Sequence, residues 1–350
     1  MPILDNSKIT RPEIIKVLEL QDEDLAKAGS IFFKKEENRQ IDFDALWNKV
    51  MEANIHWFKG EDVRGLLTMD EMIFLAKLHR NAVEVRSNEM QKRSSFMKGV
   101  KIESVDLEGV PAEWEITPGS RENKVILYFH GGGYIMGSPN STRTISVKLG
   151  IATKARILNV DYRLAPEHPY PHAIEDCVSS YKWLLSNGFD PKDIIIAGDS
   201  AGGYFTLITL IKLRNEGISL PAGAVLFSPA ADIAITGDSA ITNGPTDPIL
   251  ADLGIFWWNE CYLAGADPFS PEVSPLYADL TGLPPLLIQV STSEMLYDDA
   301  RRFVESAKKA GVDATLQSWD DSIHEFQIYD LPESTEAFLK TSEFTQKIFG

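Results

Sequence analysis

The chain has 350 residues, 44% of them hydrophobic and 24% charged, an ordinary composition for a globular protein large enough to bury a sizeable core. Its formal net charge of −17 disfavours nucleic acids and anionic membrane surfaces as standing partners, because both would repel it. No apolar run reaches the roughly eighteen residues of a membrane span, and residues 1–10 lack a basic region followed by an apolar one, so we expect no stable membrane association and a cytoplasmic location.

Residues 1–97 carry helical patterns and no strong strand pattern. Apolar residues recur at helical spacing from Asp42 to Phe58 and again from Met69 to Val83. Thr68 and Glu71 have the spacing of a capping box, which marks the start of the second of these helices. We therefore expect a helical N-terminal region over 1–97.

From residue 98 to residue 350 the pattern changes to strands that alternate with helices. We expect strands near 100–107, 112–117, 125–130, 156–160, 193–198, 223–228, 285–291 and 314–319, and helices near 142–153, 172–187, 200–215, 298–311 and 333–348. Such alternation produces parallel strands with helices on both faces, so the predicted fold class is α/β with a mostly parallel, doubly wound sheet of eight strands. A short turn at Glu108-Gly109 joins the first two strands, and that edge is expected to be antiparallel.

The strand that ends near Phe129 runs into His130-Gly131-Gly132-Gly133-Tyr134. A glycine-rich loop in this place brings backbone N–H groups close to a substrate oxygen that develops negative charge. A phosphate-binding loop would need Lys-Ser or Lys-Thr after its last glycine, and neither follows here. The sequence therefore predicts an oxyanion-binding loop that uses Gly131, Gly132 and Gly133, with His130 orienting the loop.

A second motif, Gly198-Asp199-Ser200-Ala201-Gly202, lies between the apolar run at 194–196 and an apolar helical segment at 204–213. A G-x-S-x-G turn between a strand and a helix is the context of a nucleophile elbow, which holds the serine in a strained conformation above the sheet. The helix N-terminus favours negative charge here, and the N–H of Ala201 would add an oxyanion donor. These features predict that Ser200 is a nucleophile for acyl transfer.

The general base follows by elimination. On sheets that carry such an elbow, the catalytic groups occur in the order serine, acid, histidine. Of the six histidines, only His324 follows Ser200, so it is the candidate base.

A metal site is a further possibility to weigh, at Glu167, His168 and His172. The three prolines at 166, 169 and 171 exclude a helix that would place both histidines on one face, so we expect no metal, and the acyl-transfer chemistry requires no cofactor. The two cysteines, Cys177 and Cys261, are expected to be free thiols because they are too few for a disulfide framework.

Three motifs together resemble the hormone-sensitive-lipase-like family of α/β-hydrolase esterases: His-Gly-Gly-Gly at 130–133, Asp-Tyr-Arg-Leu-Ala-Pro-Glu-His-Pro at 161–169 and Gly-Asp-Ser-Ala-Gly-Gly at 198–203. The resemblance covers roughly residues 100–345. It implies an α/β-hydrolase fold, short acyl substrates and often a homodimer formed through a sheet edge. It also implies that region 1–97 contributes to a cap and that 231–275 is a second cap segment, whose aromatic residues lie either in the core or in a pocket: Phe256, Trp257, Trp258 and Tyr262.

The resemblance also indicates the acid. In the family the acid opens an Asp-Pro-Leu-x-Asp stretch, which here reads Glu-Met-Leu-Tyr-Asp over 294–298. The acid position therefore falls on Glu294, with glutamate in place of aspartate, and Asp298 is the alternative acid. Without that role, Asp298 would be a surface carboxylate that complements a helix dipole.

Two residues depart from the family pattern. Glu325 stands directly after the candidate base, where the family commonly has glycine, and Tyr204 stands where it often has asparagine. Glu325 puts the shape of its loop in question and places a carboxylate near the base, which would raise the pKa of the histidine.

The expected function is that of a serine carboxylesterase acting on a small-molecule ester. An amidase, a deacetylase or a lactonase with the same triad is an alternative, because only the leaving group differs. A ligand-binding protein on the same scaffold is another, as in the plant gibberellin receptors, which resemble this family but lack the triad histidine. The presence of His324 argues against that alternative.

Overall fold

An eight-stranded sheet forms the centre of the molecule, which we describe from a computed structural model that covers residues 9–350 except 40 and 252–254. The stretch at 1–8, in which no leader was expected, therefore lies outside the described residues. The strand order is β1-β2-β4-β3-β5-β6-β7-β8. The strands are β1 (Lys101–Asp106), β2 (Pro111–Ile116), β3 (Arg121–Phe129), β4 (Ala155–Val160), β5 (Ile194–Asp199), β6 (Gly223–Phe227), β7 (Leu286–Ser291) and β8 (Ala314–Trp319).

The strand directions agree with the sequence. β2 is antiparallel to both β1 and β4, and every other neighbouring pair is parallel. The prediction of a mostly parallel sheet with an antiparallel edge is therefore confirmed. Because all carboxyl ends of the parallel strands meet at one edge, the loops that follow them lie together there.

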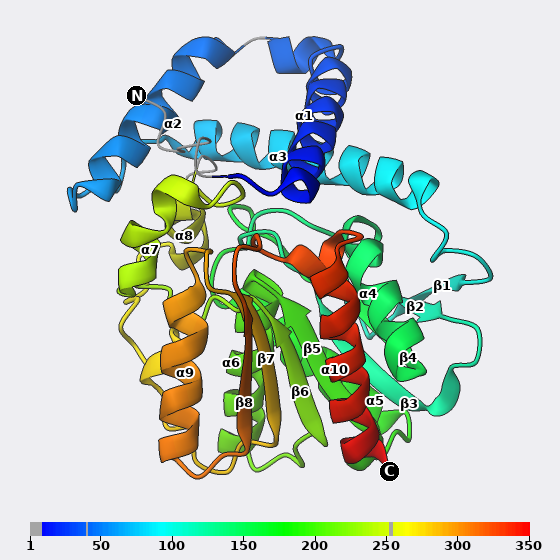
Figure 1. Cartoon of the computed structure of the whole chain (residues 1–350). Helices are drawn as coiled ribbons and strands as arrows, with labels where there is room; N and C mark the ends of the chain where they lie inside the picture. Colours follow the sequence, from blue (N-terminus) through cyan, green and yellow to red (C-terminus); the bar gives the residue numbers. More distant parts are fainter. Residues whose placement is uncertain (1–8, 40, 252–254) are drawn as a thin grey trace.

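Helices cover both faces of the sheet (Figure 1). On one face lie α4 (Pro139–Thr153) and α10 (Pro332–Phe349), and on the other lie α5 (His172–Ser186), α6 (Ala201–Asn215) and α9 (Tyr297–Lys309). Alternate side chains of β3 point to opposite faces of the sheet and pack into the two hydrophobic cores. Ile126 and Tyr128 pack with the α4 and α10 side, whereas Val125 and Leu127 belong to the larger core on the opposite side.

The N-terminal region is helical, as expected, and lies over the carboxyl edge of the sheet (Figure 1). It contains α1 (Pro12–Phe32), α2 (Phe43–Phe58) and α3 (Met69–Arg93). Thr68 and Glu71 form the predicted capping box at the start of α3. Two features differ from the sequence-based expectation: α1 was not predicted as a separate helix, and α3 continues ten residues beyond Val83. The last part of α3 packs against α1 and α4. Because these partners are distant in sequence, the local pattern of apolar residues did not reveal the extension.

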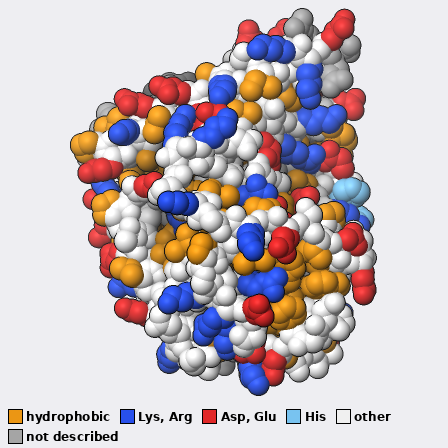
Figure 2. Space-filling view, turned by 90° about the vertical axis from the view of Figure 1, so that its right-hand side faces the viewer, with side chains coloured by type: hydrophobic (Ala, Val, Ile, Leu, Met, Phe, Trp, Pro, Cys, Tyr) orange, Lys and Arg blue, Asp and Glu red, His pale blue; other side chains and the backbone are white. Residues whose placement is uncertain are grey.

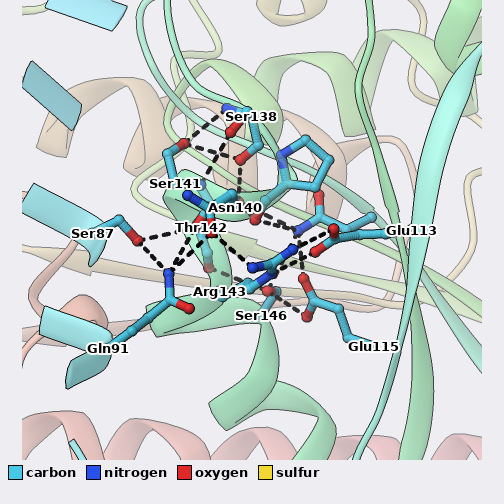
Figure 3. A network of polar contacts seen from close by, with 12 residues as sticks. Ser87, Gln91, Glu113, Glu115, Ser138, Asn140, Ser141, Thr142, Arg143 and Ser146 are labelled. Atoms are coloured by element: carbon cyan, nitrogen blue, oxygen red, sulfur yellow. Dashed lines mark hydrogen bonds and ion pairs between the residues drawn. The ribbon is translucent and has the colours of Figure 1, made fainter. Parts of the chain in front are cut away.

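A polar network attaches α3 to the body of the molecule (Figure 3). Ser87 and Gln91 of α3 donate to the backbone carbonyl of Asn140 in α4. Within the same network, Arg143 of α4 pairs with Glu113 of β2. These contacts join α3 to α4, and α4 in turn to β2, which is next to the edge strand β1.

The segment between β6 and β7 forms the second group of short helices near the carboxyl edge. It contains α7 (Asp238–Thr242) and α8 (Ile255–Leu263), and its residues 252–254 and the side chain of Phe256 lie outside the described part. Trp257 and Tyr262 are buried in the core, whereas Trp258 lines the cavity described below.

The molecular surface carries both signs of charge. On the face that Figure 2 shows, acidic, basic and apolar side chains are interspersed. Within the described ranges, no helix combines the length and apolar character that a membrane span requires.

Candidate active site

Ser200 lies in the sharp turn from β5 to α6, with backbone angles φ 50° and ψ −115°. This left-handed conformation is unusual for a residue with a Cβ atom. The turn is tight enough that a methyl group at Gly202 would lie 1.9 Å from the carbonyl oxygen of Phe129. Only glycine therefore fits there, so the glycine at this place in the motif has a steric cause in this chain.

Ser200, His324 and Glu294 lie in one line of contacts. The His324 Nε2 atom is 3.0 Å from the Ser200 hydroxyl oxygen, and His324 Nδ1 contacts Glu294 Oε2. All three side chains are buried, with Glu294 fully enclosed. The residues come from the ends of different elements: the β5 turn, the loop after β7 and the loop after β8.

The carboxylate of Glu294 is held by groups that the sequence did not single out. The Ser228 hydroxyl donates to Glu294 Oε1 over 2.8 Å, and the Ser291 N–H donates to the same oxygen over 2.7 Å. These bonds leave Oε2 directed at the histidine. Ser228 directly follows β6. Its position at the carboxyl end of a buried strand was the one feature of the sequence that could have identified it as a site residue.

Asp298, the alternative acid, has other partners. Its carboxylate accepts a hydrogen bond from the Ser239 N–H and forms an ion pair with Arg301. It is buried at 9% exposure, so the picture of a surface carboxylate at a helix start was wrong. Asp298 instead ties α9 to the segment between β6 and β7.

Burial and charge act in opposite directions on His324. Burial disfavours the imidazolium, but the carboxylates of Glu294 and Glu325 together outweigh this cost, and the pKa of His324 is raised to about 9, with Glu325 acting as expected from the sequence. The pair is therefore arranged to stabilise a positive charge on the histidine.

The glycine loop after β3 lies beside Ser200. The N–H of Gly131 donates to Asp199 Oδ2 over 3.0 Å, so it is not available to a substrate oxygen, which corrects the expectation for Gly131. Within the described part of the chain, the N–H groups of Gly132, Gly133 and Ala201 have no acceptor in the protein. These three donors border the cavity that contains the serine.

His130 is fully buried beneath this loop. Its ring stacks on Tyr162 with 4.1 Å between ring centroids, and its Nδ1 atom lies 2.8 Å from the carbonyl oxygen of Gly131. It does not contact the serine, and its position agrees with an orienting role.

The residues weighed as metal ligands lie elsewhere. The rings of His168 and His172 pack edge to face at 5.7 Å, and Glu167 forms an ion pair with Arg80 of α3. Among the described residues, no group of three or more His, Cys, Asp or Glu side chains is placed to hold a metal ion. Cys177 and Cys261 are free and buried.

Three neighbouring spaces lie on this side of the sheet, and Ser200 lines two of them. The inner chamber, of 120 Å³, is lined by Ser200, His324, Glu325 and the glycine loop. The small pocket, of 20 Å³, is lined by Ser200 and Ala201 together with apolar side chains, and His324 does not line it. Trp258 borders both spaces. The outer chamber, of 420 Å³, lies between α1, α3 and residues 328–331.

Comparison with known proteins gives consistent results. Residues 126–328 match a family model described as alpha/beta hydrolase fold. Over 241 residues, 68% of this chain and 80% of the relative, the sequence is 42% identical to an acetyl-hydrolase of Streptomyces hygroscopicus. It is 36% identical over 252 residues, 71% of this chain and 83% of the relative, to an esterase of Acinetobacter venetianus.

Solved structures agree. The crystal structure of an esterase from the bacterial hormone-sensitive lipase (HSL) family is similar with a TM-score of 0.74 at 40% identity, covering 81% of this chain and 98% of that one. A crystal structure of EstE5 soaked with p-nitrophenyl butyrate is similar with a TM-score of 0.73 at 37% identity, covering 86% of this chain and 98% of that one. With its sheet, its elbow and these similarities, the chain belongs to the α/β-hydrolase fold family, among the hormone-sensitive-lipase-like esterases.

Proposed function

We propose that this carboxylic ester hydrolase cleaves short-acyl esters with Ser200 as nucleophile, His324 as general base and Glu294 as the acid that orients it. The observation that carries these roles is the line of contacts from Ser200 through His324 to Glu294. The esterase and acetyl-hydrolase relatives support the ester as the bond that is cleaved.

The reaction follows from the geometry in two steps. His324 Nε2 takes the proton of the Ser200 hydroxyl as the oxygen attacks the ester carbonyl carbon. The carbonyl oxygen becomes negatively charged and is stabilised by the N–H groups of Gly132, Gly133 and Ala201. As the tetrahedral intermediate collapses, the C–O bond to the alcohol breaks, and the imidazolium gives its proton to the leaving oxygen.

In the second step, water replaces the alcohol. His324 takes a proton from the water as its oxygen attacks the acyl carbon, and a second tetrahedral intermediate forms. The bond to Ser200 then breaks, and the serine oxygen recovers its proton from the histidine. The carboxylate of Glu294 stabilises the imidazolium in both steps, because it accepts the hydrogen bond from Nδ1–H.

The leaving alcohol oxygen must be protonated by His324, and this requirement indicates which cavity holds the alcohol part of the substrate and which holds the acyl part. The leaving oxygen must lie within hydrogen-bond distance of His324, so the alcohol occupies the inner chamber, which His324 lines. The acyl group then points to the small pocket, which Ser200 and Ala201 border but His324 does not. A space of 20 Å³ holds about one water-sized group, so it fits the methyl group of an acetyl ester.

The helical region 1–97 and the segment 231–275 act as the cap in this proposal. α3 contributes Arg86, Ser87 and Met90 to the inner chamber, and the second segment contributes Trp258. By covering the serine, these elements exclude bulk water from the reacting groups and bound the space for the alcohol.

The direct test is the Ser200→Ala variant. We expect p-nitrophenyl acetate turnover to fall by about 10⁴-fold or more, with the circular dichroism spectrum unchanged. A wild-type kcat/KM for p-nitrophenyl acetate that exceeds that for the octanoate supports the short-acyl assignment. Retained turnover in Ser200→Ala overturns the mechanism, and an octanoate preference overturns the assignment of the small pocket.

A further inference from the structure

The inner and outer chambers adjoin and share part of their walls. Four residues line both spaces, namely Gln21 of α1, Arg86 and Met90 of α3, and Ile328 after β8. The outer chamber, which lies against α1, therefore borders the side of the active site assigned to the alcohol. A space of 420 Å³ beyond the inner chamber is large enough for a ring-sized alcohol.

Two oxygen atoms on the walls of this space are buried without a hydrogen-bond partner. They are the side-chain oxygen Oε1 of Gln21 and Oε1 of Glu325. Buried polar atoms are nearly always hydrogen bonded, and an unpaired one carries the full cost of its desolvation. Both atoms accept hydrogen bonds, so the missing partner is a donor.

The carboxyl group of Glu325 lies between Asp199 and His324. Burial and the adjacent Asp199 raise the pKa of Glu325 well above its usual range. Two carboxyl groups in contact share a proton, and Asp199 is already fixed by donors from Tyr128 and Gly131. Glu325 lines the inner chamber, and its Oε1 atom lies 3.9 Å from His324 Nε2.

The charges around the outer chamber balance, so they favour neither a cationic nor an anionic alcohol. The basic residues Lys16, Arg86 and Arg93 line this space together with the acidic residues Glu13, Asp24 and Asp330, and Arg93 pairs with Asp24. A neutral alcohol that brings hydroxyl donors satisfies the two acceptors without adding a charge.

We propose that the alcohol part of the substrate is a polyhydroxylated ring, the size of a sugar, and that Glu325 is a specificity-determining residue that accepts a hydrogen bond from one of its hydroxyl groups. Gln21 accepts a second hydroxyl at the passage to the outer chamber. This inference rests on the proposed esterase function and adds the class of alcohol to it.

The test compares two acetates of similar shape. Glucose 6-acetate and cyclohexylmethyl acetate both carry the ester on a CH₂ group of a six-membered ring, but only the first has ring hydroxyls. We expect the wild type to have a kcat/KM at least tenfold higher for glucose 6-acetate, because the apolar ring leaves the buried acceptors unpaired. A ratio near one, or a preference for the apolar ring, overturns the proposal.

Variants of Glu325 assign the preference to this side chain. Glu325→Gly removes the carboxyl group at a position where φ is 54°, which suits glycine, so the loop is expected to keep its shape. We expect the ratio of the two kcat/KM values to fall at least fivefold. Glu325→Gln can donate to Asp199 and still accept from the substrate, so it is expected to keep the ratio within about threefold. If both variants keep the wild-type ratio, Glu325 has no such role.

Glu108→Gly is the matched control. Glu108 is an exposed glutamate with φ 57° in the turn between β1 and β2, so the same change is made in the same backbone conformation away from the site. Its ratio should equal that of the wild type. Gln21→Leu should lower the ratio as well, and an unchanged ratio in that variant overturns the role of Gln21.

The two levels of the proposal fail in different ways. If the wild type hydrolyses neither acetate and no p-nitrophenyl acetate, the proposed function fails. If it hydrolyses p-nitrophenyl acetate through Ser200 but does not discriminate between the two rings, only the alcohol assignment fails.

Discussion

Two regions of the molecule differ in how deeply their residues are buried. The first is the sheet with its flanking helices, and the second is the group of N-terminal helices. Every residue of β5, β6 and β7 is buried, whereas α1 buries only four of its 21 residues. The groups of the proposed triad are attached to the first region, and the walls of the outer chamber come largely from the second. The difference teaches that the proposed reaction centre is held by a tightly packed region, while the space proposed for the alcohol also depends on a layer with fewer packing constraints.

The largest expected effect concerns the first region and its two candidate acids. Glu294→Gln should lower kcat for p-nitrophenyl acetate by about 10³–10⁴-fold, because an amide no longer fixes the tautomer of His324 or stabilises the imidazolium. Asp298→Asn should change kcat less than tenfold, since its carboxylate contacts Ser239 and Arg301 instead. Steady-state kinetics of both variants decide the point, and a larger loss in Asp298→Asn would contradict the assignment.

A matched pair of core truncations compares the two regions directly. Phe303 of α9 is fully buried in the body, and Phe32 of α1 is 5% exposed and packs edge to face on Phe74 of α3. Phe303→Ala should lower the global free energy of unfolding by about 3–5 kcal/mol. Phe32→Ala should mainly increase amide hydrogen exchange in α1, with the protection of β5 unchanged. Equal loss of protection in both regions would show that the N-terminal helices and the sheet unfold as one unit.

The smallest expected effect is a pH dependence of the reaction centre. Because the pKa of His324 is raised to about 9, the base is mostly protonated at pH 7, and kcat/KM should rise with pH by up to about tenfold per unit until it levels near the pKa. The profile is measured with p-nitrophenyl acetate after subtraction of the Ser200→Ala rate. A plateau that is already complete below pH 7 would contradict the raised pKa.

Much of the first region could be predicted because its signals are local. The strand runs, the glycine loop at 131–133 and the elbow at Ser200 each depend on neighbours within a few residues, and the predicted sheet of eight strands is confirmed. The second region was harder. α1 and the end of α3 gain their burial from each other and from α4, so their own sequences carried a weaker pattern.

Within the candidate site, the residues were easier to predict than their contacts. His324 followed from chain order, but the choice between Glu294 and Asp298 depended on which carboxylate reaches the imidazole. The occupied N–H of Gly131 and the contact of Glu325 with Asp199 had no signal in the sequence, because each joins residues from different strands.

The sequence by itself determined the class of fold, the tight turn at Ser200 and the choice of His324 as candidate base, because a strand, a tight turn and a helix form from interactions between near neighbours. The tertiary structure alone decided which acid meets the histidine, which backbone N–H groups stay available and how far the cavity extends beneath α1. These properties depend on how distant segments pack, and packing at the ångström level is fixed only when all layers are in place.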